Sequence, residues 1–184
     1  MNKSVTFEEV ISNFLAANEA KDENIISIIK NNDPNESLHT LLNKYRHLSQ
    51  VKLFSLVKDK RRLQEFNQHS WVIKDVELKY VGTWPGVGDL PKEWCQLSVL
   101  DVASMIQENS NKFSDSKSIK KIHNIQENID LVLKYFYPIL VPGGEIRKDK
   151  NLLFMPFDAD DGSHRLIAAA LSGRKNVLAY VGNC

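Results

Sequence analysis

Apolar and polar positions alternate with the period of a helix through the first seventy residues. After Thr6, apolar side chains recur three and four positions apart and define one helical face: Phe7, Val10, Ile11, Phe14 and Leu15. Thr6 and Glu9 have the spacing of a capping box at the start of this helix. The pattern predicts a first helix that begins near residue 6 and buries one face.

Three further helices are predicted before residue 70. A short one carries four isoleucines: Ile25, Ile26, Ile28 and Ile29. The next begins at Asp33, because a capping aspartate, a proline at the first helical position and Glu36 after them are typical of a helix start. The last covers residues 51–66. Residues 1–69 are therefore expected to form an all-helical N-terminal extension.

The pattern changes near residue 70. Residues 71–81 are rich in β-branched and aromatic side chains and alternate as in a strand, and the three glycines and two prolines of 82–91 indicate a loop. The elements predicted after this loop are helices over 98–105 and 119–136, strands over 139–141 and 152–157, a helix over 162–173 and a strand over 177–181. This order predicts an α/β or α+β domain over residues 70–184.

The amino-acid composition argues against several classes of protein. The chain has 184 residues, of which 42% are hydrophobic, enough for a packed core. Its 24 basic and 23 acidic residues balance, so a wholly basic nucleic-acid-binding protein is not indicated. No apolar run approaches the roughly 18 residues that span a bilayer, and no signal-peptide pattern is present. Cys95 and Cys184 are too few for a disulfide framework. We expect a cytoplasmic protein that does not enter a membrane.

One stretch is locally basic. Between residues 44 and 62, Asp59 alone opposes seven cations: Lys44, Arg46, Lys52, Lys58, Lys60, Arg61 and Arg62. Such a stretch suits the phosphate backbone of DNA, with Lys58, Lys60, Arg61 and Arg62 as contacts. A solvated helix face is the other reading of the same charges.

The densest group of polar side chains lies at the start of the helix predicted over 162–173. Backbone N–H groups at a helix N-terminus lack intrahelical partners, and the helix dipole favours an anion there. A glycine lets the backbone come close to a ligand, while hydroxyl, imidazole and guanidinium groups add donors. The sequence therefore predicts a phosphate site composed of Gly162, Ser163, His164 and Arg165.

Several roles stay open for the residues around this site. His164 suits phosphate binding or proton transfer, and Arg165 suits a phosphate contact or an ion pair with a nearby aspartate. Asp161, which follows Asp158 and Asp160, is a helix cap, a general base or a ligand for Mg²⁺ shared with a nucleotide. Glu145, in the turn at 143–145, is a catalytic candidate or a solvated turn carboxylate.

This part of the chain resembles the ParB/sulfiredoxin-like superfamily. The resemblance is carried by Tyr-Pro-Ile-Leu-Val at 137–141, by Asp-Gly-Ser-His-Arg at 161–165 and by the strand after Gly173. It covers residues 137–182, and the strand near 76–81 and the helix near 98–108 fit its order more loosely. It implies an α+β fold with a small mixed sheet and a nucleotide phosphate held by the 162–165 turn.

Departures from the pattern separate the branches of the superfamily. Sulfiredoxins have a cysteine directly before the histidine, where this chain has Ser163, which argues against sulfinic acid repair. Partition proteins, which bind DNA and CTP, continue into a helix-turn-helix, which we do not expect here. The Asp-Gly-x-His-Arg spelling is closer to members that act as kinases for free serine.

Residues and resemblance together predict a protein that binds a nucleoside triphosphate, ATP or CTP, with Mg²⁺. As an enzyme it would be a phosphotransferase or a nucleotide hydrolase. Asp161, His164 and Glu145 are then its catalytic candidates, and Asp161 is its metal ligand. Two alternatives stay open: a DNA-binding or regulatory ParB-like protein without catalysis, and a protein-interaction module. The oligomeric state is open as well, a homo-oligomer included.

Overall fold

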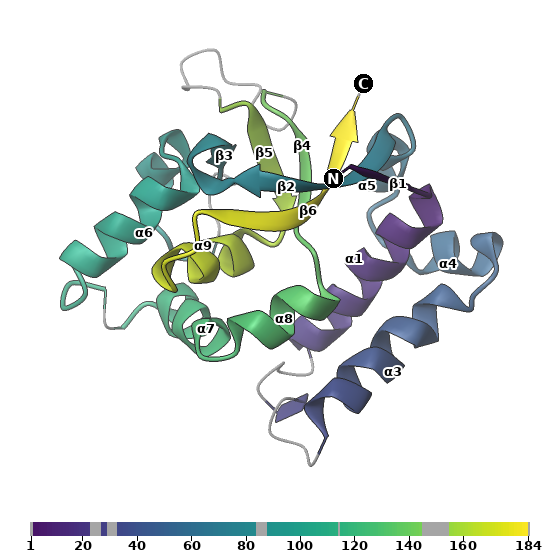
Figure 1. The fold of residues 1–184 in the computed structure, drawn as a ribbon, viewed down its shortest axis with the longest axis horizontal. Coiled ribbons are helices and arrows are strands. Elements are labelled where there is room, and N and C mark those ends of the chain that lie inside the picture. The colour runs from purple at the N-terminus through teal and green to yellow at the C-terminus, as the bar shows by residue number, and fades with distance from the viewer. Residues whose placement is uncertain are drawn as a thin grey trace.

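The computed structural model describes residues 2–22, 27–28, 33–83, 88–113, 115–144 and 155–183. Within these ranges eight α-helices and a six-stranded mixed sheet form an α/β protein (Figure 1). None of the helices in the described ranges has the length and apolar character needed to cross a membrane.

The sheet has the strand order β1-β2-β6-β4-β5-β3. In that order the strands are Lys3–Val5, Ser70–Glu77, Asn176–Asn183, Ile139–Pro142, Phe157–Asp161 and Val81–Gly82. The pairs β6–β4 and β5–β3 are parallel, and the other neighbours are antiparallel. The strand β5, which leads into the predicted phosphate turn, therefore lies between β4 and β3.

Helices cover both faces of this sheet. They are α1 (Phe7–Asp22), α3 (Pro34–Arg46), α4 (Gln50–Leu56), α5 (Lys60–Phe66), α6 (Val99–Glu108), α7 (Lys117–Gln126), α8 (Ile129–Tyr135) and α9 (Ser163–Leu171). In Figure 1, α6, α7 and α9 lie on the left and α1, α3 and α4 on the right. Two short 3₁₀ helices, Leu78–Tyr80 and Lys92–Gln96, complete the described elements.

Alternating side chains of the strands divide the interior into two clusters. On β4, Leu140 joins the cluster under α6, α7 and α9, whereas Ile139 and Val141 join the cluster under the N-terminal helices. On β6, Ala179 and Tyr180 divide in the same way. Successive residues of a strand point to opposite faces, so both faces of the sheet are buried.

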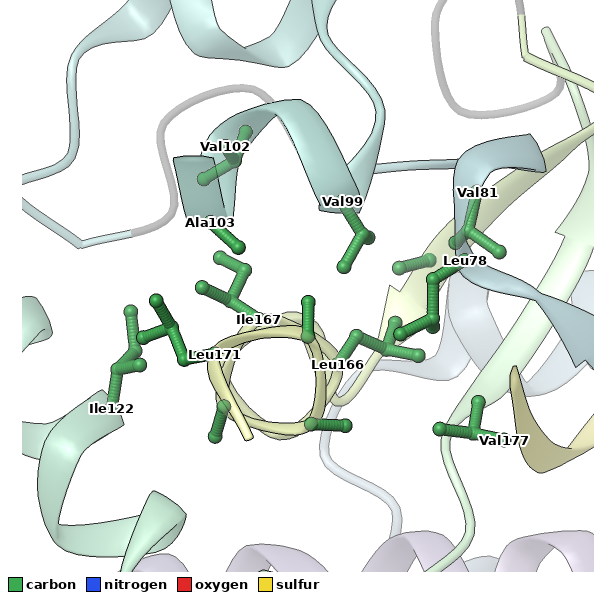
Figure 2. Close-up of a cluster of buried hydrophobic side chains, with 14 of the residues drawn as sticks. Leu78, Val81, Val99, Val102, Ala103, Ile122, Leu166, Ile167, Leu171 and Val177 are labelled. Carbon is green, nitrogen blue, oxygen red and sulfur yellow. The ribbon is translucent and has the colours of Figure 1, made fainter. Parts of the chain in front are cut away.

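The helix α9 lies at the centre of the first cluster. Its middle residues, Leu166 to Ala169, are completely buried. Figure 2 looks along this helix and shows Val99, Val102 and Ala103 of α6 on one side and Ile122 of α7 on another. Small alanine side chains let neighbouring elements approach α9 closely. The start of α9 is therefore held firmly by the packing behind it.

Helix starts that carry a side-chain cap are confirmed. The Thr6 hydroxyl accepts a hydrogen bond from the Glu9 N–H at 3.2 Å, and the Asp33 carboxylate accepts one from the Glu36 N–H at 3.0 Å. Ser98 and Asp101 form a capping box at the start of α6. These starts depend on contacts three residues apart, which a sequence displays directly.

Several predicted boundaries are wrong. The helix predicted over 51–66 is two helices, α4 and α5, because Asp59 caps a new helix. The helix predicted over 119–136 is likewise α7 and α8. The strand predicted over 71–81 ends at Glu77. The helix predicted around Ile25 to Ile29 falls mostly outside the described residues.

Two corrections change how the chain is organised. Residues 1–69 are not all helical, because Lys3–Val5 pairs with β2 and forms an edge of the sheet. The strand predicted over 152–157 is wrong in its end: β5 covers Phe157–Asp161 and so runs through the aspartates, and residues 155–156 are outside it. Residues 152–154 of that prediction lie outside the described residues. Hydrogen-bond and ion-pair partners allow the aspartates to lie in this partly buried strand.

Candidate functional site

A cavity of about 410 Å³ lies where the N-terminal helices meet the start of α9. This volume lies within the range of small-molecule sites, roughly 300–1,000 Å³. Its polar lining consists of Asn18 from α1, Arg62 from α5, Lys121 from α7 and the segment 160–165. The cavity thus joins the predicted phosphate turn to three elements that are distant from it in the sequence.

Gly162 shapes the turn that opens into this cavity. Its φ angle of +94° lies in the left-handed region, where side chains other than glycine are strained. A Cβ atom at this position would lie 3.0 Å from Nη2 and 3.1 Å from Nε of Arg165. Gly162, rather than Asp161, is the N-terminal cap residue of α9, and no side chain caps the helix from this position. Ser163 and His164, the first helical residues, line the cavity.

The Arg165 guanidinium makes hydrogen bonds to other groups of the protein. Its Nη2 donates to the Asp161 carboxylate, and its Nη1 donates to the Phe136 carbonyl at 2.7 Å. The arginine is only 8% exposed. Of the two roles open to Arg165, the ion pair with a nearby aspartate is therefore present. This pair ties β5 and α9 to the segment that precedes β4.

Arg62 makes a second ion pair in the lining of the cavity. Its Nε lies 3.0 Å from Oδ2 of Asp160, and its Nη2 donates to the Asp160 carbonyl at 3.4 Å. The guanidinium carbon also lies 5.3 Å from the centre of the Phe14 ring, a cation–π contact. The Arg62 side chain is 28% exposed and that of Asp160 only 8%. The pair connects α5 to β5 over 98 residues of sequence.

Burial raises the pKa of Asp160 to about 7, although the neighbouring Arg62 guanidinium acts in the opposite direction. The negative charges of Asp161, Glu65 and Asp59 add to the rise. A carboxyl group with a pKa near neutral exchanges its proton readily at physiological pH. Such a group in a cavity is typical of functional sites.

The three aspartates of β5 do not form a metal site on their own. Asp160 pairs with Arg62, Asp161 pairs with Arg165, and Asp158 accepts a hydrogen bond from the Gly144 N–H at 2.9 Å. Across the described ranges, no group of three or more His, Cys, Asp or Glu side chains is placed to hold a metal ion. The prediction that Asp161 holds Mg²⁺ together with a nucleotide stays a prediction, and the Asp161 carboxylate is paired with Arg165.

The basic stretch 44–62 does not form one continuous helix face. Lys60 donates to the Phe54 carbonyl at 2.9 Å, Arg61 pairs with Glu65, and Arg62 turns toward Asp160. Lys58 lies in the short connection between α4 and α5. Of the four cations expected to contact DNA, Lys60, Arg61 and Arg62 therefore have different partners.

Some of the lining could not be found from the sequence. Asn18 and Lys121 carry no local pattern that marks them, and they come from helices whose apolar faces alone were apparent. Asp160 was one of three neighbouring aspartates, and only its place opposite Arg62 distinguishes it. Glu145, the remaining catalytic candidate, lies outside the described residues.

Comparisons of this chain with protein-family models, with curated proteins and with solved structures found no match.

Proposed function

We propose that this cavity binds the phosphate groups of a nucleoside triphosphate, ATP or CTP. The observation that carries the proposal is the convergence of three positive features on one space: the N-terminus of α9, Arg62 from α5 and Lys121 from α7. A helix N-terminus favours anions through its N–H groups and its dipole. Arginine and lysine side chains are the usual partners of phosphate oxygens.

The charges of the lining favour an anion overall. Arg62, Lys121 and Arg165 carry positive charge, while Asp160 and Asp161 carry the opposing carboxyl groups. The Asp161 charge is matched by Arg165, and the pKa of about 7 leaves Asp160 only partly ionised at neutral pH. The resemblance of residues 161–165 to the nucleotide-binding turn of the ParB/sulfiredoxin-like superfamily adds independent support.

The chemistry suited to this site is transfer or hydrolysis of the terminal phosphoryl group. Such reactions depend mainly on positioning and on stabilisation of negative charge, which Arg62, Lys121 and His164 would supply. In hydrolysis, the Asp160 carboxylate would accept a proton from water while the water oxygen attacks the terminal phosphorus. The bond from that phosphorus to the leaving nucleoside diphosphate would break in the same step.

Binding is tested with a panel of ATP, CTP, GTP and ADP, each with and without Mg²⁺, by thermal shift and titration calorimetry. We expect at least one triphosphate to raise the melting temperature. Two neighbouring lysines on α7 provide a test and its control. Lys121→Met, in the cavity lining, should weaken nucleotide binding about tenfold. Lys120→Met, which replaces an exposed side chain, should leave binding unchanged. If no nucleotide stabilises the protein, the proposal is wrong.

Hydrolysis is tested separately by release of inorganic phosphate. We expect Asp160→Asn to abolish phosphate release while nucleotide binding persists. Salt-dependent binding of DNA that is lost in Arg61→Met, with no nucleotide binding, would instead support the DNA-binding alternative.

A further inference from the structure

We infer that Arg62, rather than Arg165, supplies the guanidinium that contacts the ligand phosphate. The inference rests on the proposed nucleotide binding and assigns a residue that the 162–165 turn does not contain. It also makes α5, in the N-terminal part of the chain, a wall of the binding site. The argument compares the surroundings of the two arginines.

The Arg165 guanidinium has little surface left for a ligand. One terminal nitrogen donates to the Asp161 carboxylate and the other to the carbonyls of Phe136 and Tyr137, at 2.7 and 3.4 Å. The guanidinium lies so near Gly162 that a Cβ atom there would be within 3.2 Å of it, and the Arg165 side chain is 9% exposed. A phosphate that took these donors would leave the partly buried Asp161 carboxylate and the Phe136 carbonyl without this partner, which is costly.

The Arg62 guanidinium, unlike that of Arg165, has one edge that is not occupied by protein groups of the described chain. Its Nε and Nη2 face Asp160, and its Nη1 makes no hydrogen bond within the described part of the chain. The side chain is three times as exposed as that of Arg165, 28% against 9%. Asp160 and the Phe14 ring together fix the orientation of the guanidinium. A guanidinium that is already oriented loses less conformational freedom when it binds a phosphate.

The position of Arg62 complements the other donors. It lines the same cavity as Ser163 and His164 at the start of α9 and Lys121 on α7. A phosphate in this space would therefore have donors from both helical layers. The adjacent Arg61 offers a matched control, because it is 70% exposed and pairs with Glu65 on its own helix.

The test measures dissociation constants for MgATP, MgCTP and inorganic tripolyphosphate by titration calorimetry. We expect Arg62→Met to weaken binding of the preferred nucleotide by about tenfold or more, because a charge-assisted hydrogen bond is lost. Arg62→Lys, which keeps the charge without the forked geometry, should fall between this variant and wild type. Arg61→Met should bind within about twofold of wild type. Tripolyphosphate should follow the same order, since the contact is to phosphate.

Arg62→Met leaves the Asp160 carboxyl without its partner, so folding is checked by thermal denaturation. If this variant fails to fold, the double variant Arg62→Met/Asp160→Asn removes the buried charge and provides the measurement. Wild-type affinity in a folded variant that lacks Arg62 overturns the inference and leaves the proposed function standing. A wild-type protein that binds none of the three ligands overturns both. Weakened nucleotide binding with unchanged tripolyphosphate binding would assign Arg62 to the nucleoside and also reject the inference.

Discussion

Two arginine–aspartate pairs with the same chemistry occupy different positions in this molecule. All four residues line the cavity. Arg165 and Asp161 are four residues apart and the Arg165 side chain is 9% exposed, whereas Arg62 and Asp160 are 98 residues apart and the Arg62 side chain is 28% exposed. The loss of one partner of a buried ion pair destabilises the folded protein, because the other partner is left as an uncompensated charge. The surroundings of each pair therefore determine whether it supports the fold or is available to a ligand.

Replacement of Arg165 should mainly lower stability. Arg165→Met would leave the Asp161 carboxylate and the Phe136 carbonyl without their donor, at a cost of about 3 kcal/mol in the free energy of unfolding. The control is Arg174→Met, which removes a more exposed ion pair with Asp130 and should cost less than about 1 kcal/mol. Urea denaturation measures both values. Equal losses in the two variants would contradict a supporting role for Arg165.

Asp160 should make stability depend on pH. Its pKa rises from 3.8 to about 7 on folding, so the folded protein binds one proton more than the unfolded chain between these values. Stability is therefore lost as pH rises through this interval, by on the order of 1 kcal/mol per pH unit. The free energy of unfolding of wild type relative to Asp160→Asn should fall from pH 5 to pH 8.

The comparison with Asp160→Asn isolates this carboxyl from other titrating groups. The charged and titratable groups near it are Arg62, Glu65 and Asp59 from α5 and its N-terminal cap, Asp161 on its own strand, and the cavity side chains Lys121, His164 and Arg165. These remain in the variant, so the difference between the two curves reports Asp160. A difference that is constant, or that grows in favour of wild type with pH, rejects the assignment.

At the scale of single elements, the start of α9 depends on a glycine. Gly162 and Gly173 bound this helix and both have positive φ angles, +94° and +79°. A Cβ atom at Gly173 would meet nothing within 4 Å, whereas one at Gly162 would crowd the Arg165 guanidinium. Gly173→Ala should therefore cost about 1 kcal/mol through backbone strain alone.

Gly162→Ala should cost about 1 kcal/mol more than Gly173→Ala, because Arg165 must move to admit the methyl group. It should also weaken nucleotide binding, since the displaced turn forms a wall of the cavity. Thermal denaturation and the nucleotide titration check the two effects. Equal destabilisation by the two substitutions would show that Arg165 moves away from the methyl group without a cost in the free energy of unfolding.

Elements with local signals could be predicted from the sequence, and elements that depend on distant partners could not. The capped starts of α1, α3 and α6 were predicted because the cap and its target are three residues apart. The end of the strand β5 was predicted too early, because its aspartates look like a loop until Arg62 and Arg165 supply their partners. The strand β1 is three residues long, and only its pairing with β2 defines it.

The candidate site divides in the same manner. Residues 162–165 were predicted as a group, because glycine, polar residues and a helix start are adjacent in the chain, and the structure places them on one cavity. Arg62 and Lys121 join them only through tertiary packing. Periodicity reports which face of a helix is buried, and it does not report which residue the opposite face meets.

At the scale of the whole molecule, the N-terminal helices and the rest of the chain share one core. The cluster under α1 and α3 contains Trp71, Ile139, Val141 and Tyr180 from the sheet, each no more than 4% exposed. The Tyr180 hydroxyl also donates to Glu9 of α1 at 3.2 Å. Removal of residues 1–69 would uncover an apolar face that monomeric proteins do not leave exposed.

A fragment of residues 70–184 should consequently fail to fold on its own, in contrast to an independent domain. Each buried aromatic or aliphatic side chain that returns to water costs about 1.5–3 kcal/mol. For the four sheet residues together this cost is comparable with the whole stability of a typical domain, about 5–15 kcal/mol. We expect the fragment to lack a cooperative thermal transition and dispersed amide resonances. Adding residues 1–69 as a separate chain should restore both, together with nucleotide binding, because α5 brings Arg62 to the cavity. A cooperative fragment that binds nucleotide unaided would show that the N-terminal helices contribute neither core nor site.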